Sequence, residues 1–115
     1  ETPGARDTVR ISYTAPYKVY TALLTQEGTD APIATVLENT LGGTVTWSYF
    51  NPSTYDATLT GGFPANKTWC IITLSTDDYL VAPRAGRRDN DTCRFMYDEG
   101  IGAGVQVQVE IRVYN

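Results

Sequence analysis

Hydrophobic and polar residues alternate near both ends of this chain. Close to the C-terminus, five aliphatic residues recur at every second position: Val105, Val107, Val109, Ile111 and Val113. A period of two places such residues on one face of a strand, so the pattern predicts a half-buried β-strand over 105–114. Val9, Ile11 and Tyr13 alternate with polar neighbours in the same way and predict a first strand over 8–14.

Short turn-forming stretches divide the middle of the chain at regular intervals. They lie at 26–30, 39–43, 51–53 and 61–64, and all contain Gly, Pro, Asn or Asp residues that favour tight turns. The runs that they bound, together with those that follow, predict further strands at 17–25, 33–38, 44–50, 55–60, 68–75, 79–82 and 92–97.

About nine short strands at this spacing leave no room for crossover helices of a dozen residues. The sequence therefore predicts one all-β domain over 1–115, an antiparallel β-sandwich or jelly roll, or else a barrel. Residues 1–7 are expected to form an extended N-terminal arm. Residues 83–91 contain no apolar residue larger than Pro or Ala and are expected to form a solvated loop.

Two of the predicted strands are apolar on both faces. In 17–24 and 69–74, apolar residues fall at odd and even positions alike, as in strands that are covered on both sides. Loops folded over the outer face of a central strand explain this pattern, and so does a neighbouring subunit. Of the two, the loops carry more weight from this feature alone.

Composition narrows the classes of function. The 115 residues include no histidine, which removes the usual general base and the commonest metal ligand. The net charge of -4 argues against a surface that tracks phosphates, and no apolar stretch approaches the roughly 18 residues that span a bilayer. We therefore expect no enzyme activity, no cofactor or metal, no nucleic-acid partner and no membrane insertion.

The two cysteines, Cys70 and Cys93, each lie in a predicted strand. In an oxidising compartment they can pair, and closing the loop between them would stabilise the fold by roughly 3 kcal/mol in the chain-entropy model. Two buried free thiols that pack as small hydrophobic residues fit the sequence equally well. Neither alternative provides catalysis, because a nucleophilic thiol needs a base or an electropositive pocket.

Aromatic residues provide the first candidates for a contact surface. Val45, Trp47 and Tyr49 share one face of their strand and are expected to point into the core. Phe50 lies on the opposite face, and Tyr55 lies in the next strand. Because exposed aromatic side chains offer a large contact area at low entropic cost, both are candidate contact residues.

A basic spot provides the second set of candidates. Arg84, Arg87 and Arg88 can bind a phosphate, a sulfate or an acidic neighbouring subunit, although such a group is more often simply solvated. The nearby Asp89 and Asp91 provide at most a fragment of a calcium site, and we expect them to form turns.

Parts of the chain resemble a family of small uncharacterised β-rich proteins of tailed phages of Bacteroidota, marine viruses and related bacteria. The resemblance lies in the segments 17–26, 31–32, 36–42, 58–61, 66–68 and 109–114. These segments are strands and turns without a catalytic signature. The resemblance implies a virion-associated domain such as a head fibre, decoration or tail component, and it implies no functional residue.

These observations lead us to expect a non-enzymatic structural or adhesive domain in a virion or outside the cell. Its expected partners are copies of itself, in a trimer or filament, or other virion proteins. Unpaired edges of the terminal strands are the expected sites of strand addition between subunits. The alternative is a carbohydrate-binding module, free-standing or part of a larger secreted protein, that recognises a cell-surface glycan.

Overall fold

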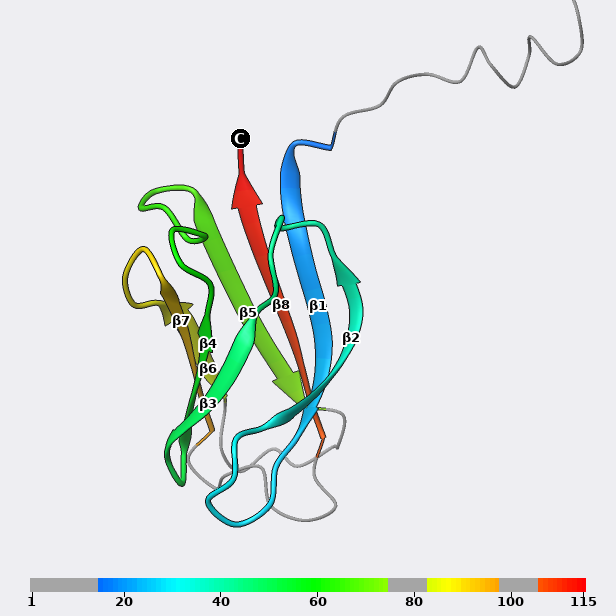
Figure 1. The fold of residues 1–115 in the computed structure, drawn as a ribbon, viewed down its shortest axis with the longest axis vertical. Helices are drawn as coiled ribbons and strands as arrows, with labels where there is room; N and C mark the ends of the chain where they lie inside the picture. Colours follow the sequence, from blue (N-terminus) through cyan, green and yellow to red (C-terminus); the bar gives the residue numbers. More distant parts are fainter. Residues whose placement is uncertain (1–14, 75–82, 98–105) are drawn as a thin grey trace, which may run out of the picture.

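The computed structural model describes residues 15–74, 83–97 and 106–115, which contain eight β-strands and no helix. The strands are β1 (Tyr17–Thr25), β2 (Ile33–Asn39), β3 (Thr46–Asn51), β4 (Thr54–Thr58), β5 (Thr68–Leu74), β6 (Arg84–Arg87), β7 (Thr92–Met96) and β8 (Val107–Tyr114). They form two four-stranded antiparallel sheets, which we name sheet A, in the order β2-β1-β8-β5, and sheet B, in the order β3-β4-β7-β6. The two sheets face each other (Figure 1). The prediction of an all-β, antiparallel, sandwich-like fold is therefore confirmed.

The C-terminal strand β8 lies in the middle of sheet A. It pairs with β1 from Tyr17 opposite Tyr114 to Leu24 opposite Val107, and with β5 on its other side. The alternation predicted from the sequence is present, because Val107, Val109, Ile111 and Val113 are all buried. Since β8 has a neighbour on each side, its edges are not free, and the expectation that the C-terminal strand offers an edge to another subunit is wrong.

The loop between β1 and β2 is organised by one buried amide. Gln26 is 5% exposed, and its Nε2 donates hydrogen bonds to the carbonyl oxygens of Glu27, Gly28 and Asp30 at 3.1, 2.6 and 3.0 Å. Gly28 adopts a φ of 57°, which glycine reaches without the steric penalty of a side chain. The turn predicted here from the sequence therefore returns the chain into sheet A as β2.

The core lies between the sheets and joins them through aromatic side chains. Tyr20 of sheet A and Trp47 and Phe95 of sheet B are at most 8% exposed, and the rings of Trp47 and Phe95 lie 5.2 Å apart. The indole Nε1–H of Trp47 donates to the hydroxyl oxygen of Tyr20 at 3.0 Å. Burial raises the pKa of Tyr20 above its ordinary value, although the hydrogen bond with Trp47 opposes the shift. The hydroxyl is thus neutral at physiological pH and satisfies the buried indole.

One predicted loop is a strand. Residues 84–87 form β6, which pairs with β7 from Arg84 opposite Met96 to Arg87 opposite Cys93. The prediction of a solvated loop over 83–91 was wrong for this part because an edge strand needs only backbone pairing on one side and tolerates polar side chains. The arm at 1–7 and the predicted strands at 8–14 and 79–82 lie outside the described residues. A ninth strand and the jelly-roll form of the sandwich stay predictions.

The buried hydrogen bond between the sheets gives a first test. Tyr20→Phe leaves the Trp47 N–H without its acceptor in the core, and we expect it to lower the free energy of unfolding by about 1–3 kcal/mol. Urea denaturation measures this loss. Tyr114→Phe removes the same hydroxyl from a tyrosine that is 38% exposed, so its effect should stay within about 0.5 kcal/mol. Equal losses in the two variants would contradict the proposed role of the bond.

Candidate functional site

Exposed apolar side chains gather on one of the two sheets. The described residues include seven exposed large apolar side chains, and of these Phe50 lies in sheet B. The others belong to β2, β5 and β8 of sheet A: Ile33, Val36, Leu37, Trp69, Ile71 and Tyr114. A concentration of this kind is uncommon on a monomeric protein, and it makes this sheet the candidate contact surface.

The outer face of sheet A, which points away from sheet B, is hollowed at its centre. A cavity of about 300 Å³ lies there over the middle two strands and their neighbours. Leu23, Leu37 and Ile71 contribute apolar side chains to it, while Thr21, Thr73, Gln108 and Glu110 add polar groups. Apolar side chains with polar groups around them are the usual composition of a protein contact site.

Arg112 organises the aromatic end of the same face. Its guanidinium carbon lies 4.6 Å from the ring centroid of Tyr17 and 4.7 Å from that of Trp69. Its Nε donates to the carboxylate of Glu110 at 2.7 Å, and hydrogen bonds to Tyr114 and Glu110 raise the pKa of this arginine. The cation therefore remains charged, and it holds two aromatic rings from neighbouring strands in fixed positions.

Strand β2 forms one edge of sheet A. Its seven residues carry one charge, at Glu38, and no proline. Ile33, Val36 and Leu37 are 66%, 50% and 62% exposed. Proteins usually protect such edges with lysine, proline or a very short strand. The pairing of β2 with β1 has one register shift, between Thr21 and Ala22. Most of the β2 edge therefore offers backbone groups in strand geometry.

The two aromatic contact candidates have opposite surroundings. Phe50 is 57% exposed on the outer face of sheet B, and the Arg94 guanidinium lies 4.2 Å from its ring centroid. Tyr55 is completely buried, and its hydroxyl donates to the carbonyl oxygen of Pro52 at 2.9 Å. Tyr55 is therefore a core residue, and its prediction as a contact residue is corrected. Phe50 as a contact residue stays a prediction.

The basic candidates meet at a shallow hollow of about 390 Å³ beside β6, lined by residues 84–88 together with Arg94 and Met96. Arg87 donates from Nε to the carbonyl oxygen of Phe63 at 2.6 Å, and so ties β6 to the loop after β4. Arg88 and Asp89 are 3.5 Å apart and well exposed. Arg84 is exposed as well. The structure therefore brings the three arginines together, but the guanidinium of Arg87 is already bound to the loop after β4.

Arg94 is already paired within sheet B. Its guanidinium donates two hydrogen bonds, of 2.8 and 2.9 Å, to the carboxylate of Asp56 in the neighbouring strand β4. Asp56 is 9% exposed, so this pair is partly desolvated. Hydrogen bonding to Asp56 also raises the pKa of Arg94. The hollow is thus less basic than its arginines alone suggest.

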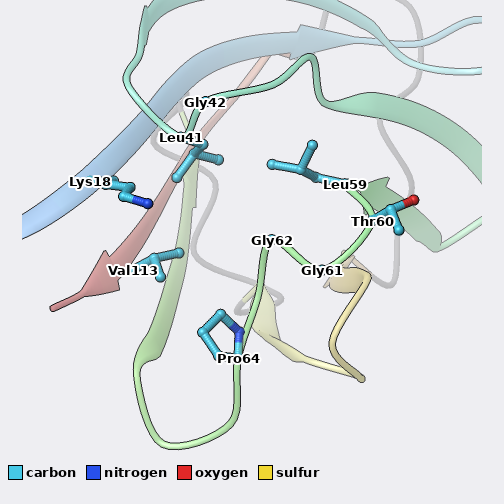
Figure 2. Close-up of a pocket in the computed structure, with 9 residues that line it drawn as sticks. All are labelled: Lys18, Leu41, Gly42, Leu59, Thr60, Gly61, Gly62, Pro64 and Val113. Carbon is cyan, nitrogen blue, oxygen red and sulfur yellow. The ribbon is translucent and has the colours of Figure 1, made fainter.

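Another hollow, of about 240 Å³, lies at the end of the sandwich where β8 finishes. Figure 2 shows Lys18, Leu41 and Val113 on one side and Leu59 and Thr60 across from them. The rest of its wall is Gly42, Gly61, Gly62 and Pro64. Lys18 is the charged residue of this wall and is exposed. One solvated amine among glycines gives the hollow no specific ligand chemistry.

The cysteines face each other across the sandwich. Both are free thiols, and their sulfur atoms lie 3.1 Å apart.

Within residues 15–74, 83–97 and 106–115, no group of three or more acidic or cysteine side chains is placed to hold a metal ion. In the same ranges, no helix is long and apolar enough to cross a membrane.

Comparisons of the chain with protein-family models, with curated proteins and with solved structures found no match. The case for a function therefore rests on the residues themselves.

The sequence indicated this face only indirectly. The two strands that are apolar on both sides, 17–24 and 69–74, contribute Leu23, Trp69 and Ile71 to it. The sequence did not single out Leu37 or Arg112. A register shift in the β1–β2 pairing places Leu37 on this face, and the pairing of β8 with β1 and β5 places Arg112 there. Sequence patterns within one strand carry neither piece of information.

The turn between β6 and β7 gives a test by pH. The Asp89 carboxylate accepts a hydrogen bond from the backbone N–H of Asp91 at 2.9 Å, and this bond lowers the pKa of Asp89. A lowered pKa adds stability above the ordinary range of aspartate, about pH 4, and that stability is lost as the pH falls through the folded-state value. We expect Asp89→Asn to lower the melting temperature at pH 7, with a difference from the wild type that shrinks below about pH 4.

Thermal unfolding at pH 7, 5 and 3 measures this difference. Glu27→Gln removes one negative charge from the exposed β1–β2 loop and controls for the change in net charge. A difference between wild type and Asp89→Asn that persists unchanged at pH 3 would contradict the role of the ionised carboxylate.

Proposed function

We propose that this chain is a non-enzymatic structural domain that assembles with copies of itself through the outer face of sheet A and the β2 edge. The observation that supports this proposal most is the concentration of exposed apolar side chains on sheet A. In a sandwich, each sheet uses one apolar face to build the core. Exposed apolar side chains on the opposite face of the same sheet therefore favour a further contact.

A second copy of the chain suits this surface for two reasons. The net charge is only -4, so that copies do not repel one another strongly, and Glu110, the charged residue of the hollow, is paired with Arg112. The β2 edge adds backbone groups that can pair with the same edge of a second copy, which gives a closed, symmetric dimer. Larger assemblies, trimers or filaments, use the same face together with a second contact.

The biological setting that we propose is a virion or the outside of a cell, with the domain as a head fibre, decoration or tail component. This part of the proposal is supported by the sequence resemblance described above. Other virion proteins are then further partners for the same face.

Assembly is tested by mass photometry or light scattering at micromolar concentration. We expect an oligomer for the wild type. Ile71→Lys and Leu37→Lys each place a charge in the apolar hollow and should weaken association at least about tenfold. Thr46→Lys adds the same charge to an exposed position on sheet B and should leave the oligomer unchanged.

A monomeric wild type would overturn self-assembly. A Thr46→Lys variant that dissociates as much as Ile71→Lys would overturn the assignment of the contact to sheet A. Circular dichroism of each variant shows whether the fold is retained.

Carbohydrate binding is the second candidate, because the same face exposes aromatic rings. Trp69 and Tyr114 are 42% and 38% exposed, and each presents ring surface against which a sugar can stack. Tryptophan fluorescence titrated with polysaccharides tests this function. Isothermal titration calorimetry follows binding in the variants, because Trp69→Ala removes the exposed fluorophore. We expect binding to be lost in Trp69→Ala, whereas Phe50→Ala on sheet B should retain it. No response across a broad glycan panel would remove this candidate.

A further inference from the structure

The two thiols of the chain meet between the sheets. Cys93 lies in β7 of sheet B and is completely buried, and Cys70 lies in β5 of sheet A and is half-buried. Their sulfur atoms are 3.1 Å apart, although 23 positions separate them in the chain. They are also the only two cysteines of the sequence, so that neither has another partner within the chain.

Strand pairing fixes both positions. Cys70 lies opposite Ile111 of β8, which is fully buried, so Cys70 belongs to the inner face of sheet A. Cys93 lies between Ala57 of β4 and Arg87 of β6 on the inner face of sheet B. Because both sulfur atoms are held by paired strands, their approach does not depend on a loop.

We propose that Cys70 and Cys93 are a redox site that forms an intrachain disulfide between the two sheets by exchange with a small disulfide such as oxidised glutathione. The bond would cross-link β5 to β7 at the side of the sandwich where the edge strands β5 and β6 are in contact. The proposal rests on the thiols alone and is independent of the proposed assembly.

The exchange balances in two steps. The thiolate of Cys70 attacks one sulfur of oxidised glutathione, the glutathione disulfide breaks, and one glutathione leaves with the proton that Cys70 gave up. The thiolate of Cys93 then attacks the sulfur of Cys70 and releases the second glutathione with the second proton. Two protein thiols are oxidised, and one glutathione disulfide is reduced to two thiols.

The environment assigns the order of the two steps. The hydrogen bond between the thiols lowers the pKa of Cys70, and the same bond together with burial raises the pKa of Cys93. Cys70 is also the more exposed of the two. It is therefore the sulfur that reacts first with a small disulfide from solution, and Cys93 resolves the mixed disulfide from inside the core.

The first experiment uses the wild-type chain in two forms, reduced with dithiothreitol and incubated with oxidised glutathione. After unfolding and alkylation, mass spectrometry should show two alkylated thiols in the reduced form. The oxidised form should show none and no attached glutathione. Its melting temperature should be higher by about 10 °C, because the cross-link restricts the unfolded chain.

Three results would overturn the proposal: two thiols that stay open to alkylation after oxidation, a glutathione adduct that persists, or a disulfide-linked dimer on non-reducing electrophoresis. Equal melting temperatures of the two forms would overturn the prediction that the cross-link stabilises the fold.

Cys70→Ser is the matched control. It removes the half-buried sulfur at a position where a hydroxyl can be tolerated, and leaves Cys93 in the core. We expect its melting temperature to be the same with dithiothreitol and with oxidised glutathione. A redox-dependent shift of the wild-type size in this variant would also overturn the pairing.

Discussion

The fold depends on closing two sheets over one core in which buried polar groups have partners. Trp47 of sheet B brings an indole N–H into this core, and the Tyr20 hydroxyl of sheet A accepts it. Among the described residues, no buried side-chain nitrogen or oxygen is left without a hydrogen-bond partner. Because an unpaired donor in the core costs about 1–3 kcal/mol, this bond favours the packing of the sheets in which Trp47 and Tyr20 are opposite each other.

The closed core leaves sheet A with large apolar side chains on both of its faces. One of them packs against sheet B, and the other presents Leu37, Trp69 and Ile71 to the outside. On the outer face of sheet B, by contrast, a paired Arg94 and Asp56 lie next to Phe50. This asymmetry between two sheets of equal size is the physical basis of the proposed assembly.

Much of the fold was predictable from the sequence, whereas only part of the candidate site was. The buried row of β8 follows from alternation, because burial of one face imposes a period of two, whereas β1 follows from its apolar residues and the turn that bounds them. Tyr55 was misjudged, because a shift of one position moves a side chain from solvent to core and no pattern fixed the register of β4. Strand β6 was missed because backbone pairing at an edge needs no apolar residue.

The sequence by itself determined the class of fold, since its alternating residues and frequent turns suit only antiparallel sheets. It also determined that histidine chemistry is absent from the chain. Tertiary structure alone decided which residues meet: Cys70 with Cys93, and Tyr20 with Trp47. It also decided that the exposed apolar residues of β2 and β5 belong to the same sheet. The physical reason is that periodicity is a local property of a strand, whereas these contacts depend on the order in which distant strands pair.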